Sequence, residues 1–233
     1  MGPSKKDSEE PKPPAQDTLQ GTEAGRQTRR WERRRSEILR TAECAFAELG
    51  FGATTLENVA CRLELRRASL AYYFDDKEAL YDGVFREILL EVRERMQPAF
   101  DEEDPLTGME TITSVWVDFL QERPDAGRVI LRQTVDGLAP RSELTREVFF
   151  GLLDGMSNVI GRGVERGQFK RFDAGEFGAM IAGTSLFWFS SQDTLQRGFG
   201  FDPLTPENIE SLRHRLVQLT RQLLEAPDKK GNQ

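Results

Sequence analysis

The sequence contains few of the residues from which catalytic and metal sites are usually built. It has one histidine, His214, and two cysteines, Cys44 and Cys61, and these three do not stand at zinc-ligand spacings. It also lacks a glycine-rich loop of the kind that holds phosphate groups in many enzymes. We therefore expect no metal ion, no cofactor and no enzymatic activity. Each cysteine is interpreted as a small apolar residue, although a redox role for either one stays open.

Long apolar segments are also lacking. A membrane-spanning helix needs about 18 apolar residues in a row, and the best stretch, residues 180–189, is interrupted by Gly, Thr and Ser. The first residues of the chain lack the apolar core of a signal peptide. We therefore expect a cytoplasmic protein without membrane contact. With 233 residues, 38% of them hydrophobic, the chain can form one sizeable core and a smaller domain.

The charge of the chain is negative overall but unevenly distributed. The net charge is −7, which by itself does not suit a nucleic-acid-binding protein. From Arg26 to Lys77, however, eleven basic residues face eight acidic ones, a net charge of +3, so the remainder carries −10. A basic segment on an acidic chain indicates localised contact with nucleic acid. The alternative is an ordinary solvated run of charges.

Residues 54–77 have the pattern of helix, tight turn and helix. Thr54 and Glu57 have the spacing of a capping box, which marks the start of a helix. The apolar face of that helix consists of Leu56, Val59, Ala60 and Leu63. A second helix is expected from about Arg66 to Phe74, and it would bury Leu65, Leu70 and Phe74.

The outward face of this second helix carries side chains that suit DNA, namely Arg67, Ser69, Tyr72 and Tyr73. In a helix-turn-helix unit the second helix enters the major groove. Arg can pair with guanine, and Ser and Tyr hydroxyls can contact base edges or phosphates. The alternative is a packed helical hairpin with a charged outer face.

Four features follow one another in this region. They are a glycine-aromatic step before paired threonines, the Val59-Ala60 pair, a Leu70–Phe74 block ending in Tyr-Phe, and the Lys77–Leu80 start of a further helix. In this order, from about Ile38 to Phe85, the segment resembles the DNA-binding part of the tetracycline-repressor (TetR) family of bacterial transcription regulators. The resemblance implies DNA contacts by Thr55, Arg66, Arg67, Ser69, Tyr72, Tyr73 and Lys77. Thr55 would touch a phosphate, Arg67 and Ser69 would face the groove, and Tyr72, Tyr73 and Lys77 would hold the DNA backbone.

Three residues depart from the family pattern. Glu64 stands where a turn glycine is usual, Arg66 where a small capping residue is usual, and Ala71 where tyrosine is frequent. Glu64 would have to adopt a left-handed or distorted turn conformation, which is mildly unfavourable without glycine. Arg66 would add a cation but no cap.

The N-terminal residues fall into two parts. The first is polar and proline-rich, and we expect a disordered tail over residues 1–27. The second, Thr28–Glu37, is a basic arm leading into a first helix. Its arginines Arg29, Arg30, Arg33 and Arg34 could reach a phosphate or the minor groove, and a solvated helix face is equally compatible with the pattern.

The remainder predicts an all-α fold. Asp76 would cap a helix reaching Met96, and further helices are expected over 109–120, 124–135, 142–166, 174–191 and 206–224, the last capped by Thr205. We expect a helix-turn-helix DNA-binding domain over 28–82, a helical effector-binding and dimerisation domain over 83–227, and a disordered tail over 228–233.

The last helix carries a seam of apolar residues spaced by three and four: Ile209, Leu212, Leu216, Leu219 and Leu223. Such a seam needs a partner. The resemblance implies a homodimer in which the helices Ala174–Ser191 and Pro206–Leu224 pair with their symmetry mates. The alternative is that the seam packs within its own chain.

Aromatic residues are frequent in the second domain and raise the question of a ligand. The candidates for an effector pocket are Trp116, Phe119, Phe149, Phe150, Phe177 and Trp188. The resemblance implies a repressor that a small effector releases from a palindromic operator, and the aromatic content is compatible with a hydrophobic effector. The alternatives are a helical interaction adaptor, and a small-molecule carrier or enzyme without specific DNA binding.

Overall fold

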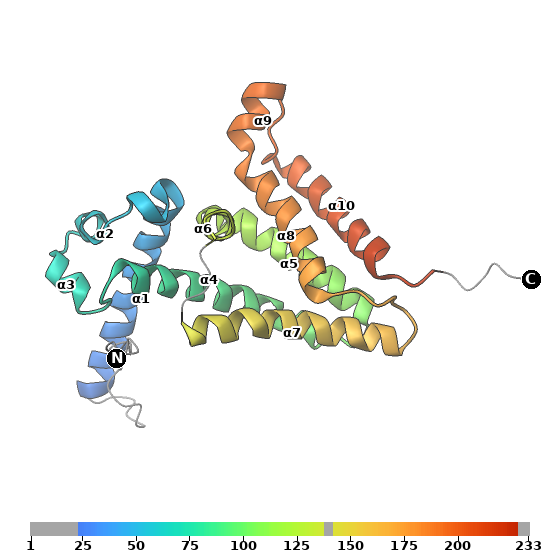
Figure 1. The fold of residues 1–233 in the computed structure, drawn as a ribbon, viewed down its shortest axis with the longest axis horizontal. Helices are drawn as coiled ribbons and strands as arrows, with labels where there is room; N and C mark the ends of the chain where they lie inside the picture. The colour runs from blue at the N-terminus through green and yellow to red at the C-terminus, as the bar shows by residue number, and fades with distance from the viewer. Residues whose placement is uncertain (1–22, 138–141, 228–233) are drawn as a thin grey trace, which may run out of the picture. The chain divides into compact units, whose positions relative to one another are not determined.

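The computed structural model of the chain describes residues 23–137 and 142–227 (Figure 1). Within these ranges the regular structure consists of ten helices, and the only pairing of the strand type is an isolated bridge between Phe169 and Glu225. The expected all-α fold is confirmed. Residues 1–22 and 228–233 of the expected tails lie outside the described ranges. Residues 23–27, also expected in a tail, instead belong to the first helix.

The chain divides into two compact units, Met1–Val84 and Phe85–Gln233. The N-terminal unit contains α1 (Glu23–Ala53), α2 (Leu56–Arg62), α3 (Arg67–Ala71) and the start of α4 (Lys77–Phe100). Its core is formed by side chains that are almost fully buried: Ile38, Ala42, Phe46, Val59, Leu70, Phe74, Leu80 and Val84. The boundary between the units falls inside α4, so one continuous helix belongs to both.

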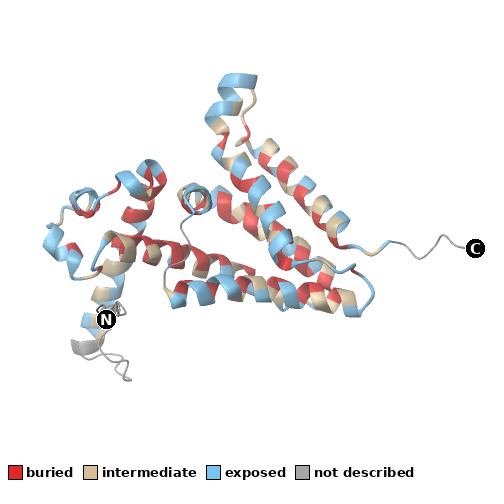
Figure 2. Cartoon of the chain, viewed as in Figure 1, coloured by how far each residue is buried: buried red, intermediate tan, exposed pale blue. Residues whose placement is uncertain are grey.

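The C-terminal unit is a bundle built around one helix, α5 (Pro105–Glu122). The other helices that lie wholly in this unit are α6 (Pro124–Val135), α7 (Glu143–Glu165), α8 (Ala174–Ser190), α9 (Gln192–Phe199) and α10 (Pro206–Leu224). Helix α5 packs against α6, α7, α8 and α10. It is accordingly the most buried of them, and Figure 2 shows buried residues along the faces that these helices turn toward one another.

Several helix ends lie where the sequence predicts them. The side chains of Asp76, Ser142, Asp173 and Thr205 each accept a hydrogen bond from the backbone N–H three residues on.

Helix α6 has the bounds that the sequence predicts. Helix α4 runs beyond Met96 to Phe100, and α5 begins earlier than expected because Asp104 caps it. Helix α9 was not expected from the sequence, and none of its residues is buried.

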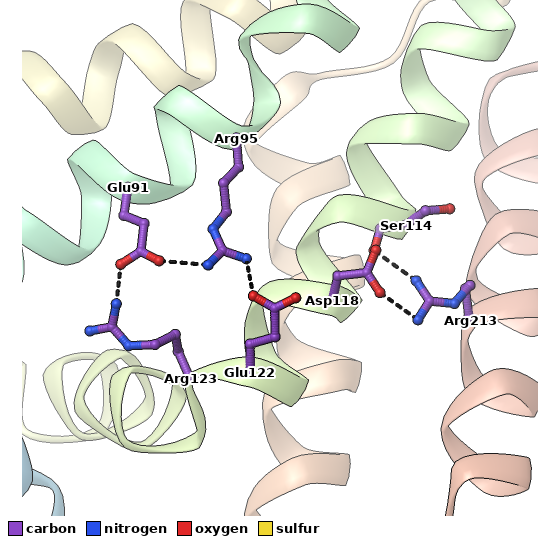
Figure 3. A network of polar contacts seen from close by, with 7 residues as sticks. All are labelled: Glu91, Arg95, Ser114, Asp118, Glu122, Arg123 and Arg213. Atoms are coloured by element: carbon purple, nitrogen blue, oxygen red, sulfur yellow. Dashed lines mark hydrogen bonds and ion pairs between the residues drawn. The ribbon is translucent and has the colours of Figure 1, made fainter.

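Ion pairs join the helices at the surface of the C-terminal unit (Figure 3). Arg95 on α4 donates to Glu91 and to Glu122, each over 2.7 Å, and Arg123 also pairs with Glu91. Partial burial alone would lower the pKa of Arg95, but its hydrogen bonds with Glu122 and Glu91 raise that pKa above its ordinary value. These contacts connect α4 to the junction of α5 and α6.

A second cluster joins α10 to α5. The Arg213 guanidinium donates to the Asp118 carboxylate over 2.6 Å and to the backbone carbonyl of Ser114 over 3.0 Å (Figure 3). The Arg213 side chain is 19% exposed. Arg213 also donates to Glu210, which is 70% exposed, and Asp118 is 48% exposed, so water can replace Arg213 at both carboxylates. The part-buried carbonyl of Ser114 would lose its donor as well, which costs more than the loss of a surface ion pair alone.

We therefore expect Arg213→Met to lower the free energy of unfolding by about 1–2 kcal/mol, measured by urea denaturation at fixed protein concentration. The matched control is Arg197→Met, since the Arg197 side chain is 83% exposed and lies 3.9 Å from Asp193. The control should change stability by less than about 0.5 kcal/mol. Equal effects of the two variants would contradict the assigned role of Arg213.

Candidate nucleic-acid interface

Helix α2 begins one residue later than expected. The Thr55 hydroxyl oxygen accepts from the backbone N–H of Asn58 over 3.1 Å, and the Asn58 side chain accepts from the backbone N–H of Thr55 over 3.0 Å. This is the capping box, so the predicted pair of Thr54 and Glu57 is wrong. Thr54 is instead fully buried and donates its hydroxyl proton to the carbonyl of Gly50 over 2.7 Å. Thr55 therefore stands at the N-cap, just before the first turn of α2, and it is exposed.

The turn between α2 and α3 has the strained conformation that the sequence predicts. Glu64 has a φ of 54°, in the left-handed region that favours glycine. Hydrogen bonds close the turn around it, including one from the Leu65 N–H to the carbonyl of Ala60 over 2.9 Å. Arg66 stands at the N-cap of α3 without a side-chain capping bond, as expected.

Helix α3 has only five residues, Arg67–Ala71, and is shorter than predicted. Leu70 is fully buried, and Phe74, which follows the helix, is 2% exposed. The backbone N–H groups of Tyr73 and Phe74 both donate to the carbonyl of Leu70. Leu65 is half-buried, so it contributes less to the core than predicted. The inner side of α3 is therefore fixed by Leu70 and the turn that follows it.

The outer side of α3 is open to solvent. Arg66, Arg67, Ser69 and Tyr72 are exposed, and 67% of Tyr72 is accessible. Arg67 forms an ion pair with Glu57 over 2.9 Å, but both side chains are more than half exposed. Such a surface pair contributes at most about 1 kcal/mol, so a stronger partner can displace it.

Tyr73 and Lys77 lie differently from the other predicted DNA-contacting residues. Tyr73 is half-buried, and its ring stacks on Trp31 of α1 with 5.8 Å between ring centroids. Lys77 donates to the backbone carbonyl of Phe51 over 2.9 Å and lies over the Phe51 ring. Both side chains hold parts of the N-terminal unit together, and their direct contact with DNA stays a prediction.

The aromatic candidates for an effector pocket fall into separate groups. Trp116 and Phe119 stack on each other in the core of the C-terminal unit, and Phe177 is buried at 1% exposure. Phe149 and Phe150 contact each other on α7 and are exposed. Trp188 packs against Phe201. The structure therefore does not gather the six rings in one place, and their role in effector binding stays a prediction.

The apolar seam of α10 is largely occupied within its own chain. Ile209, Leu212 and Leu216 are buried, and α10 packs on α5 and α8. The interpretation that the whole seam needs a partner chain is therefore wrong. These three residues pack within their own chain, which was the alternative. Helix α8 does expose Met180 and Phe187, at 48% and 66%.

Neither of the two cysteines, Cys44 and Cys61, forms a disulfide within the described residues, and Cys61 is exposed on α2. In residues 23–137 and 142–227 no cluster of three His, Cys, Asp or Glu side chains is placed to hold a metal ion. Within the same ranges, no helix combines the length and the apolar character needed to cross a membrane.

A capped helix, a tight turn and a short second helix that is buried behind and exposed in front form a helix-turn-helix unit. The comparisons agree with this class. Residues 38–84 match the family described as bacterial regulatory proteins, tetR family, and residues 105–219 match the tetracyclin repressor-like C-terminal domain.

Individual relatives extend these matches over most of the chain. The HTH-type transcriptional regulator RutR of Escherichia coli K12 is 30% identical over 171 residues, which cover 72% of this chain and 76% of RutR. A TetR family regulator from Marinobacter aquaeolei VT8 has a TM-score of 0.67 at 20% identity, covering 85% of this chain and 99% of that one. The structure of AibR in complex with isovaleryl coenzyme A and operator DNA has a TM-score of 0.64 at 14% identity, covering 80% of this chain and 97% of that one.

The chain belongs to the TetR family of bacterial transcription regulators. It is therefore a ligand-responsive regulator of transcription that binds DNA, as predicted. Dimerisation through the C-terminal domain is typical of this family, and its members are typically not enzymes.

The left-handed conformation of Glu64 generates a test. Because glycine adopts this conformation without a steric penalty, Glu64→Gly should raise the free energy of unfolding by up to about 1 kcal/mol. Glu64→Ala is the matched control, since it removes the same charge but keeps the Cβ atom, and it should not stabilise the protein. Thermal or urea unfolding of the three proteins measures the difference. Equal stabilisation by Gly and Ala would show that charge, not backbone conformation, is the cause.

Proposed function

We propose that the chain represses transcription by binding a palindromic operator, and that a small effector bound in the C-terminal unit releases it. The observation that carries the DNA-binding part is the contrast between the two sides of α3. Leu70 is fully buried, whereas Arg66, Arg67, Ser69 and Tyr72 are exposed. A short helix held rigidly from behind can present these side chains to the major groove in a fixed position.

The exposed residues have different roles in this proposal. Arg67 reads a base, because a guanidinium can bind guanine O6 and N7 together. Ser69 contacts a neighbouring base edge or phosphate. Arg66, Tyr72 and Thr55 hold the DNA backbone, which fixes the register of the helix but carries no sequence information. Tyr73 and Lys77 support the unit from inside and reach phosphates only at its edge.

A homodimer is the assembly that a palindromic operator requires, because each protomer presents one α3 to one half-site. The exposed Met180 and Phe187 of α8 support pairing through this helix, together with the solvent-facing side of α10. The buried Ile209, Leu212 and Leu216 belong to the core of one protomer and do not take part.

The effector part of the proposal rests on the contact of α5 with α8. The Trp116 indole N–H donates to the Ser185 hydroxyl over 2.7 Å, and both residues are buried. A small molecule with a hydrophobic part that entered between these helices would shift their packing. Helix α4 belongs to both units and is tied to the α5–α6 junction by Arg95, so it can carry this shift toward the DNA-binding unit. The protein would act in the cytoplasm, where the DNA is.

The test is binding of the purified full chain to the DNA upstream of its own gene, compared with a scrambled duplex of equal length. The wild type should bind one site saturably and release it as salt rises. Arg67→Ala/Ser69→Ala should lose about 1–3 kcal/mol of binding free energy per half-site and most of the preference for that site.

The matched control is Arg171→Ala/Ser157→Ala, which removes the same groups from exposed positions of the C-terminal unit. It should bind like the wild type. If the wild type does not prefer any sequence, or if the α3 variant keeps the preference, α3 does not read the operator and the proposed function fails.

A further inference from the structure

Helix α1 extends well beyond the core that it helps to form. It begins at Glu23, whereas its first fully buried apolar residue is Ile38. A helical segment without an apolar face gains little from packing and is marginal on its own. Two contacts hold it against the turn after α3: Trp31 stacks on Tyr73, and the Arg35 guanidinium lies 5.2 Å from the centroid of the Phe74 ring.

These contacts leave a cleft between the extension and the end of the helix-turn-helix unit. Its volume is about 670 Å³. One wall consists of four arginines of α1, namely Arg26, Arg30, Arg33 and Arg34, and the other includes Tyr72 and Tyr73. The arginines stand at spacings of four, seven and eight residues from Arg26, which places them along one side of the helix. Arg29 does not line the cleft.

The charge of this wall is only partly compensated within the protein, since Arg26 has a partner and Glu37, which pairs with Arg34, also lines the cleft. Residues 26–35 contain six arginines and one glutamate. Arg34 pairs with Glu37, but no hydrogen bond or ion pair joins Arg30 or Arg33 to another described residue. Like charges at helical spacing destabilise a helix. An external anion would relieve this repulsion, so the wall is better suited to a bound anion than to solvent alone.

The position and length of the wall favour a polyanion over a small one. Tyr72 borders both the cleft and the exposed side of α3, so DNA on α3 lies next to the cleft. From Arg26 to Arg34 the wall is about 12 Å long at about 1.5 Å per residue. A single phosphate covers only part of this length, whereas duplex DNA presents about one charge per 1.7 Å of its axis.

We propose that this cleft, which we call the arginine cleft, is a second DNA contact that binds the sugar-phosphate backbone beside the site read by α3. The proposal rests on the proposed function for the position of the DNA. The arginine cleft supplies affinity and salt dependence without reading bases, and α3 supplies the sequence preference. The stack of Trp31 on Tyr73 fixes the angle at which the extension meets the backbone.

The experiment measures the dissociation constant of the full chain on the operator and on a scrambled duplex across a salt series. Arg30→Ala/Arg33→Ala should weaken binding to both duplexes by the same factor, on the order of tenfold or more. The logarithm of the association constant decreases linearly with the logarithm of the salt concentration, and the variant should make this slope shallower. The change should be about 0.9 for each lost contact, or about 3.6 for two arginines in each protomer of a dimer. The ratio of the two affinities should stay as in the wild type.

The control is Arg171→Ala/Arg197→Ala, which removes the same charge from exposed positions of the C-terminal unit and should leave both constants unchanged. Trp31→Ala should weaken binding to both duplexes without any change of charge. Because Arg30 and Arg33 are both exposed, the circular dichroism spectrum of Arg30→Ala/Arg33→Ala should match that of the wild type.

Three results would overturn the proposal: an unchanged salt slope in Arg30→Ala/Arg33→Ala, an equal loss in the control, or a loss confined to the operator. Failure of the proposed function gives a different result from these three, because the wild type would then bind the operator and the scrambled duplex equally. The scrambled duplex would still report whether the arginine cleft binds the DNA backbone.

Discussion

The exposed side of α3 depends on the burial of one side chain, Leu70, at the back of the same helix. Helix α3 has five residues, no side-chain cap and a left-handed residue before it, so it cannot be stable alone. Burial of Leu70, supported by Phe74, holds it in place. Truncating a buried leucine typically costs about 2–5 kcal/mol, far more than the surface pair of Arg67 with Glu57 contributes. The core therefore sets where the DNA-contacting side chains stand.

Much of the fold could be predicted because its helices carry a repeated apolar stripe or a clear end signal. Helix α6 starts at Pro124, and α10 starts at Pro206 after the Thr205 cap, as expected. Helix α9 was not predicted because it is short and buries none of its residues, and only Leu195 and Phe199 mark an apolar side. The α2 cap was predicted one residue too early because Thr54 with Glu57 fits the usual capping-box pattern, whereas the box that forms joins Thr55 to Asn58. The burial of Thr54 excludes it from the cap.

The site was less predictable where it depends on contacts distant in the sequence. Exposure of Arg67, Ser69 and Tyr72 follows from the local pattern around Leu70. The stack of Trp31 on Tyr73 does not follow from the local pattern, because the two residues are far apart in the sequence. The signal that could have indicated it is a tryptophan inside a run of arginines. Periodicity also cannot say which chain covers an apolar seam, and residue type cannot distinguish the buried Phe119 from the exposed Phe150. Only packing answers those questions.

In the proposed function, α3 reads the operator through Arg67. Selection of binding sites from a library of random duplexes, carried out with the wild type and with Arg67→Ala, tests it most directly. The wild type should enrich a two-fold symmetric sequence containing a guanine in each half-site. Arg67→Ala should enrich the same sequence with the preference lost at that one position. An asymmetric or absent motif in the wild type, or the same motif in both proteins, would contradict this account.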